Sequence, residues 1–340
     1  MAVRYQDNKL LSYDEWLVAR NNHIGASILG TLVYGNSYSS SLELFWNFIG
    51  AGKPTVENIR MFLGTETQDL SAKCWTFYDG TEQSVVENAR RNTPVKKYIN
   101  HNYTYFNDLY PHLAVTPDGE IQDFGVYAGK GKGSLEIKNT QSWVLASYET
   151  GLPTDNVIQL CGQMMVAEYG YGNLFYFIDN SKFQCYDLER KDTKNIEELI
   201  LQHTEPFWHN VLLARPLYNK LYEARRNYNQ RLVGELENEI ARLEPPPQNS
   251  TGYLNFLTER YKDKLAESGI IKGTDMQLLI AQKHKQLGKE IDTLEKEQMT
   301  LEIEIKNILG NNNTLDFGKN GKITWIENKN GKRIFKNALK

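Results

Sequence analysis

The stretch Thr-Pro-Asp-Gly at residues 116–119, followed by Ser-Leu-Glu-Ile-Lys at residues 134–138, decides the fold of this chain. Polar and apolar residues alternate in the second stretch, and this pattern predicts a β-strand with two different faces. Glu136 and Lys138 therefore share one face, while the leucine and isoleucine beside them point the other way, into a core. Asp118 stands between a proline and a glycine, so we expect it at a turn that can aim its carboxylate.

Asp118, Glu136 and Lys138 have the residue types and spacing of a metal-dependent nuclease core. Phosphodiester cleavage needs a cation at the scissile phosphate, and Mg²⁺ prefers carboxylate, carbonyl and water oxygens. The two carboxylates and the carbonyl of Ile137 could supply three such ligands. Lys138 would orient the attacking water or stabilise developing negative charge. The alternative interpretation is a turn aspartate beside an exposed Glu/Lys pair on an edge strand.

Three further segments fit one protein family in the same order along the chain. They are Glu-Trp-Leu-Val-Ala-Arg at 15–20 with Ile-Gly-Ala-Ser at 24–27, Asn-Ile-Arg-Met-Phe-Leu-Gly-Thr-Glu at 58–66, and the run 153–164 with its glutamines. With the core strand, they make residues 10–215 resemble the phage-type recombination exonucleases, the family of lambda exonuclease and the YqaJ-like viral recombinases. The resemblance implies an α/β fold with a PD-(D/E)xK nuclease core, in which helices flank a central mixed sheet.

The resemblance also implies roles for individual residues of the core. Asp118 and Glu136 match the metal ligands of the family, with the Ile137 carbonyl as a third ligand. Lys138 matches the catalytic lysine. Gln159 matches the first glutamine of a Gln-rich helix and joins the expected catalytic set.

Arg20 and Ser27 match the arginine and serine that hold the 5′-terminal phosphate of a DNA end in this family. Arginine can bind two phosphate oxygens at once, and serine adds a hydroxyl group. Without the resemblance, Arg20 could equally be a solvated arginine at a helix end, and Ser27 could be a helix N-cap.

Gln68 is the first departure from the family pattern. The family usually has an acid at this position, four residues after the glycine of its second helix. A glutamine can hydrogen-bond a metal-bound water but adds no charge. Either Glu66 or Asp69 therefore substitutes through a register shift, or the site keeps fewer carboxylates.

Cys161 is the second departure, because it stands where the family usually has a second glutamine. Gln163 follows Gln159 by four residues, and residues at this spacing share a helix face. Both glutamines could therefore point toward the site.

The resemblance implies a Mg²⁺-dependent DNA exonuclease, with Mn²⁺ able to substitute, that acts 5′ to 3′ on double-stranded DNA ends. The product would be a 3′ single strand for a single-strand annealing protein in phage-type recombination. A homo-oligomer, typically a trimeric ring around DNA, is expected from the same family. The alternatives are an endonuclease of the same fold, for restriction or junction resolution, and a catalytically decayed module that binds DNA ends.

Composition limits these interpretations without deciding between them. The formal net charge of the 340 residues is −3, so DNA binding would need a local positive track. Candidates for that track are the pairs Arg90/Arg91 and Lys96/Lys97 and the Gly-Lys-Gly-Lys-Gly loop at residues 129–133, which could also be a plain turn.

The three cysteines, at 74, 161 and 185, have no metal-binding spacing and no disulfide framework, so a reducing cytoplasm fits. We expect no membrane span, because no apolar run of sufficient length occurs.

The chain is expected to contain three parts: a nuclease domain at 1–215, a helical, coiled-coil-like arm at 216–310, and a basic β-hairpin tail at 311–340. Apolar residues repeat with heptad spacing between 287 and 308. A second apolar stripe at 232–243 could pair with them as an antiparallel coiled coil, and three prolines at 245–247 separate the two helices. The arm could serve oligomerisation or partner docking, or be a structural helical hairpin.

Overall fold

The structure, a computed structural model, describes residues 3–36, 38–52, 59–148, 152–262, 272–328 and 330–339. The chain divides into two compact units, Met1–Asp263 and Lys264–Lys340. The boundary expected at residue 215 falls inside one long helix, α8 (Lys194–Arg226). Asn58, the first residue of the segment expected to form the second helix of the family, lies outside the described residues.

A five-stranded mixed sheet forms the centre of the first unit, in the order β3-β6-β7-β8-β9. Neighbouring strands are antiparallel except for β7 and β8, which run parallel. The strands are β3 (Tyr98–Ile99), β6 (Gly119–Ile121), β7 (Gly133–Thr140), β8 (Tyr171–Ile178) and β9 (Lys182–Glu189). The predicted core strand at 134–138 is therefore the middle strand, with neighbours on both sides.

A second, four-stranded sheet has the order β1-β4-β5-β2. Its strands are β1 (Val3–Asp7), β4 (Tyr103–Asn107), β5 (Leu113–Val115) and β2 (Ile24–Gly25). The pairing of β2 with β5 places the short 3₁₀ turn η2 (Ala26–Ile28), which carries Ser27, at the end of this sheet.

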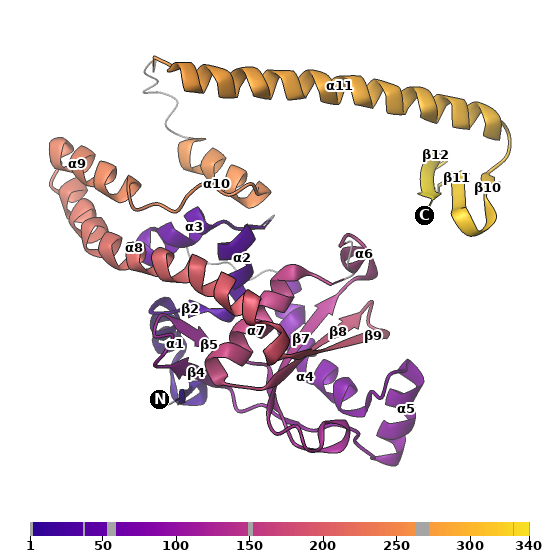
Figure 1. The fold of residues 1–340 in the computed structure, drawn as a ribbon, viewed down its shortest axis with the longest axis horizontal. Helices are drawn as coiled ribbons and strands as arrows, with labels where there is room; N and C mark the ends of the chain where they lie inside the picture. The colour runs from indigo at the N-terminus through magenta and orange to yellow at the C-terminus, as the bar shows by residue number, and fades with distance from the viewer. Residues whose placement is uncertain are drawn as a thin grey trace. The chain divides into compact units, whose positions relative to one another are not determined.

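Helices surround both sheets of the first unit (Figure 1). Before the central strand β7 they are α1 (Tyr13–Asn21), α2 (Leu29–Tyr34), α3 (Ser41–Trp46), α4 (Ile59–Phe77) and α5 (Glu82–Arg91). After it come α6 (Ser142–Leu145), α7 (Thr154–Ala167), α8, α9 (Gln230–Ala241) and α10 (Thr251–Tyr261).

Two apolar clusters lie on opposite faces of the central sheet. The α4 face contains Trp75, and it also buries Leu135 and Ile137 of β7. The α7 face contains the main core, to which α2, α7 and α8 contribute. Because side chains alternate along a strand, Glu136 and Lys138 face α7. The expected α/β fold, a mixed sheet flanked by helices, is confirmed.

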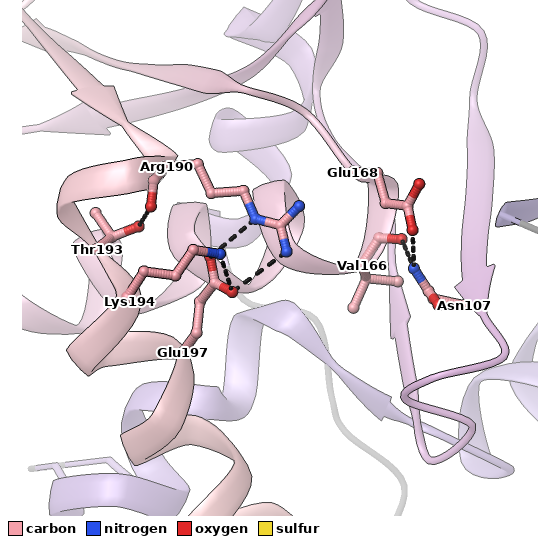
Figure 2. Close-up of polar contacts among 7 residues, drawn as sticks. All are labelled: Asn107, Val166, Glu168, Arg190, Thr193, Lys194 and Glu197. Atoms are coloured by element: carbon pink, nitrogen blue, oxygen red, sulfur yellow. Dashed lines mark hydrogen bonds and ion pairs between the residues drawn. The ribbon is translucent and has the colours of Figure 1, made fainter. Parts of the chain in front are cut away.

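Polar contacts fix the C-terminal end of α7 and the beginning of α8 (Figure 2). The Asn107 amide donates to the Val166 carbonyl and to the Glu168 carboxylate, each at 3.2 Å. After β9, Arg190 donates two hydrogen bonds to the buried carboxylate of Glu197 on α8, at 2.8 and 3.2 Å. Burial alone would raise the pKa of Glu197, but its hydrogen bonds to basic side chains lower it. The contacts of Asn107 help to fix α7, the helix that supplies two glutamines to the site.

The apolar stripe of α9 does not form the coiled-coil arm that its sequence suggested. Leu236 and Ile240 are instead buried in the main core, where α9 packs beside α8 (Figure 1). The reason is that α8 continues past residue 215 and presents buried Leu221 and Ala224 on the same side of the unit.

The second unit contains α11 (Asp275–Leu309), a helix of 35 residues that begins with a capping box between Thr274 and Gln277. A three-stranded antiparallel sheet follows, in the order β10-β11-β12. Its strands are β10 (Thr314–Asp316), β11 (Gly321–Glu327) and β12 (Arg333–Leu339). The expected terminal hairpin is present as β11 and β12, and β10 adds a strand that the sequence did not indicate.

None of the helices within the described residues is long and apolar enough to cross a membrane.

Candidate active site

Asp118 lies beside the middle of the central strand because β6 begins directly after it. In the antiparallel pairing Gly119 lies opposite Leu135, so Asp118 comes just before the paired region and faces the continuation of β7. Its Oδ2 accepts a hydrogen bond from the Ile137 N–H at 2.7 Å. A residue in a strand directs its N–H and C=O toward the same edge. The carbonyl of Ile137 is therefore directed to the same side as the Asp118 carboxylate.

Glu136 and Lys138 form the second half of the cluster. The Lys138 Nζ lies 2.6 Å from Glu136 Oε1, and only 3% of Glu136 is exposed to solvent. The lysine side chain keeps 27% of its surface exposed, so the ammonium group is at the border between protein and solvent. This arrangement leaves the charged end of the site accessible from one side.

Gln159 and Gln163 both reach Glu136 from one face of α7. Gln159 Nε2 donates to Glu136 Oε1 at 2.7 Å, while its Oε1 accepts from Lys138 Nζ at 2.9 Å. Gln163 Nε2 donates to Glu136 Oε2 at 2.6 Å. The two amides therefore hold both oxygens of the Glu136 carboxylate. Gln159 also accepts one hydrogen bond from the Lys138 ammonium group.

Gln68 extends from α4 to the other carboxylate. Its Nε2 donates to Asp118 Oδ1 at 2.6 Å, whereas Glu66 is exposed on the same helix. Gln68, which stands where the family usually has an acid, therefore enters the site itself. No register shift brings Glu66 into its place. Cys161 is buried away from the carboxylates, near Thr193, and burial raises the pKa of its thiol to about 12.

The electrostatics of the cluster are those of two carboxylates forced close together. Burial and the charge of Glu136 raise the pKa of Asp118 to about 8. Burial alone would lower the pKa of Lys138, but the charges of Glu136 and Asp118 and the hydrogen bond to Glu136 raise it above its ordinary value. At neutral pH the site therefore holds the charged Glu136–Lys138 pair and a mostly protonated Asp118, whose proton a cation would displace.

The donor set suits a hard divalent cation. Asp118 and Glu136 supply carboxylate oxygens from adjacent strands, and the Ile137 carbonyl is directed to the same edge. Within the described ranges, no group of three or more His, Cys, Asp and Glu side chains could hold a metal ion. A cation here would thus depend on two carboxylates, a carbonyl and water, which is the ligand set that Mg²⁺ accepts.

Arg20 and Ser27 are both exposed, and both come from the segments that precede α2. The Arg20 guanidinium lies over the Trp16 ring, 5.1 Å from its centroid, in the last turn of α1. Leu29, two residues after Ser27, packs closely against α7. A Cβ at Gly162 of that helix would lie only 2.3 Å from the Leu29 side chain. In the part of the chain that the structure describes, no hydrogen bond or ion pair joins Arg20 or Ser27 to the carboxylates.

The positive-track candidates are mostly engaged within the protein. Lys96 is buried over the rings of Trp75 and Tyr78, and burial lowers its pKa. In the glycine-lysine loop, Lys130 pairs with Glu189 at 2.9 Å, and the other lysine pairs with Glu120 at the same distance. Both lysines of the loop are therefore paired with carboxylates, although their side chains remain partly exposed.

Sequence reasoning missed three polar side chains that support the site. Ser134 donates to Gln163 Oε1 at 2.8 Å, and Asn139 Nδ2 donates to Thr67 Oγ1 at 2.5 Å. Asn156 on α7 donates to the Tyr176 hydroxyl at 2.9 Å. Ser134 could have been found, because it shares the strand face of Glu136, whereas the other two depend on contacts between distant segments.

The mixed sheet, with one carboxylate just before β6 and a carboxylate and a lysine on the neighbouring β7, is that of the PD-(D/E)xK fold class. Residues 15–170 match the sequence model of the YqaJ-like viral recombinase domain. Residues 15–170 are therefore similar to this domain, and the family resemblance drawn from the motifs is confirmed over that range.

The solved structures that are similar to this chain include two of one enzyme. One is an alkaline exonuclease (LHK-Exo) from Laribacter hongkongensis, with 18% identity, a TM-score of 0.43, and coverage of 61% of this chain and 99% of that chain. The other is LHK-Exo in complex with dAMP, with 16% identity, a TM-score of 0.42, and coverage of 64% and 99%. No curated protein matches this chain.

Proposed function

We propose that this chain is a Mg²⁺-dependent deoxyribonuclease that degrades duplex DNA from its ends, 5′ to 3′. The observation that carries the proposal is the convergence of Asp118, Glu136 and Lys138 beside the central strand, with the lysine at the border to solvent. The YqaJ-like domain at residues 15–170 supports the recombination context. Polarity comes from the family resemblance and not from the geometry.

Asp118, Glu136 and the Ile137 carbonyl would hold the cation, and Mn²⁺ should substitute because it also accepts oxygen ligands. A bound Mg²⁺ supplies Lewis-acid polarisation of the scissile phosphate and a more acidic water.

Lys138 supplies positive charge in this mechanism. Since the pKa of Lys138 is raised, its ammonium group stays protonated at neutral pH and cannot act as the general base. It instead donates hydrogen bonds that orient the attacking water and stabilise the negative charge that develops on the phosphate. Gln159 positions this group, because its amide bridges Lys138 and Glu136.

Arg20 and Ser27 form the proposed clamp for a 5′-terminal phosphate. Both side chains are exposed, and a guanidinium and a hydroxyl are both groups that can bind a phosphate. The clamp would explain action at ends and would place the scissile bond at the metal. The partners that follow are duplex DNA ends, an annealing protein that takes the 3′ strand, and further copies of this chain in a ring, typically a trimer.

The test is digestion of an end-labelled linear duplex in Mg²⁺, with and without a 5′-phosphate, beside a closed circle. We expect loss of nucleotides from the phosphorylated 5′ end and an intact circle. Arg20→Ala should lower the rate on the phosphorylated end by about tenfold and leave the rate on the unphosphorylated end unchanged. Cutting of the circle would show an endonuclease, and no cleavage in Mg²⁺ or Mn²⁺ would show a decayed DNA-binding module.

A further inference from the structure

The sheet β10-β11-β12 in the second unit has one face whose aromatic residues pack at the end of α11. Ile323 is buried on this face with Leu309 at the end of α11. Arg333 lies over the Trp325 ring at 3.9 Å and donates to the carbonyls of Gly310 and Asn312. The aromatic side chains and the arginine of this sheet are therefore engaged with the helix end and its following loop.

The opposite face of the same sheet is open. The register pairs Thr324 with Lys336 and Ile326 with Ile334 across β11 and β12, and it pairs Asp316 with Lys322 across β10 and β11. Residues paired in this way point to the same face. Of this set, all but the half-buried Thr324 are exposed.

Positive charge is concentrated in this segment of an otherwise acidic chain. Residues 319–340 contain seven lysines and arginines and a single acid, Glu327, whereas the whole chain has a net charge of −3. Two of the seven, at positions 329 and 340, lie outside the described residues. Among the residues that the structure describes, Lys322 and Lys336 take part in no ion pair, and Asp316 accepts a hydrogen bond from the Gly318 backbone.

We propose that this open face, with Lys322 and Lys336 as its charged contacts, binds the backbone of duplex DNA away from the ends. The two lysines lie diagonally across the strand pair, so that both can face neighbouring phosphates of one duplex. Small antiparallel sheets are an established type of DNA-binding surface. A single strand fits less well, since binding single strands relies on exposed aromatic side chains, and those of this sheet face the helix.

This contact is separate from the proposed cleavage, because it needs neither a free end nor a metal. Its value to an end-acting enzyme would be a second attachment to the same duplex, which raises the local concentration of DNA at the site.

The experiment uses the full-length protein in EDTA with a duplex whose two ends are closed by hairpins. The variant is Lys322→Gln with Lys336→Gln. The control, Lys283→Gln with Lys289→Gln, removes the same charge from an exposed part of α11, on the order of 30–40 Å along the helix from Leu309. Affinity is measured between 50 and 200 mM salt, and circular dichroism checks that each variant is folded.

Each lysine–phosphate contact contributes about 0.9 to the slope of log affinity against log salt concentration. We expect the slope for the sheet variant to be smaller than the wild-type slope by about 1.8. Between 50 and 200 mM salt, the affinity of wild type should therefore fall by a factor about ten times larger than that of the variant. The α11 control should keep the wild-type slope. An unchanged slope in the sheet variant, an equal change in the control, or tighter binding of wild type to single-stranded DNA would overturn the proposal. A cleavage-inactive protein with the expected slopes would refute only the nuclease function.

Discussion

Replacement of Gln68 by glutamate would add a third carboxylate directly beside Asp118. The glutamine amide donates to Asp118 Oδ1 at 2.6 Å, so the change replaces an attractive contact by two like charges. Loss of a hydrogen bond to a charged group costs about 1.5–3 kcal/mol, and like charges about 4 Å apart repel by about 4 kcal/mol at an effective dielectric constant of 20. In EDTA at pH 9, we expect the two effects together to lower the free energy of unfolding by about 6 kcal/mol, and the Tm by about 12–24 °C.

The loss in the Gln68→Glu variant should depend on protons and metal. The pKa of Asp118 is about 8, so at pH 6.5 this carboxyl is mostly protonated and the repulsion largely disappears. Saturating Mg²⁺ at pH 9 should remove most of the deficit, because the added carboxylate becomes a ligand. Differential scanning fluorimetry of Gln68→Glu, with Gln68→Leu as the control for the lost hydrogen bond, measures each case. The same Tm deficit at both pH values, with and without Mg²⁺, would refute the assignment of a cation to these carboxylates.

Two further predictions concern the cluster. Because the folded state keeps a proton on Asp118 that the unfolded state loses near pH 4, the stability contribution of this group without metal is greatest below pH 4 and declines until about pH 8. A cation must displace that proton, so the affinity for Mg²⁺, measured by calorimetry, should rise about tenfold per pH unit from pH 6 to 8 and then level off. An affinity that does not change with pH would contradict the raised pKa of Asp118. Gln163→Leu leaves Glu136 Oε2 and the Ser134 hydroxyl without their partner inside the core, so urea unfolding should show a loss of about 3 kcal/mol. A loss below 1 kcal/mol would mean that water replaces the amide.

The central part of the site could be predicted from sequence because its geometry is local. Alternation within residues 134–138 determines that Glu136 and Lys138 share a face, and spacing by four determines that Gln159 and Gln163 share one. The antiparallel pairing of β6 and β7 then brings Asp118 to the same place.

The contribution of Gln68 could not be settled from sequence, because it depends on how α4 is docked on the sheet. That docking is fixed by contacts between distant residues: Trp75 donates to Asn173 at 2.8 Å, and Ser71 donates to Asn139 at 2.7 Å. Neither pair has a sequence pattern that names its partner.

The role of α9 was mistaken for a related reason. An apolar stripe at heptad spacing shows that a helix buries one face, but it does not identify what covers that face. In this chain α8 covers the stripe of α9. The short strand β10 was missed because three residues carry too little pattern, and its pairing with β11 defines it.

The central claim is that the cluster around Lys138 cleaves DNA, and single-turnover digestion of a 5′-phosphorylated linear duplex tests it most directly. Wild type and Lys138→Ala are compared in Mg²⁺ at equal DNA occupancy, with Tm values to show that both are folded. Removal of the ammonium group should lower the cleavage rate by at least about 10³-fold, with DNA affinity within a few fold of wild type. A folded Lys138→Ala protein that releases nucleotides at the wild-type rate would show that cleavage does not take place at this cluster.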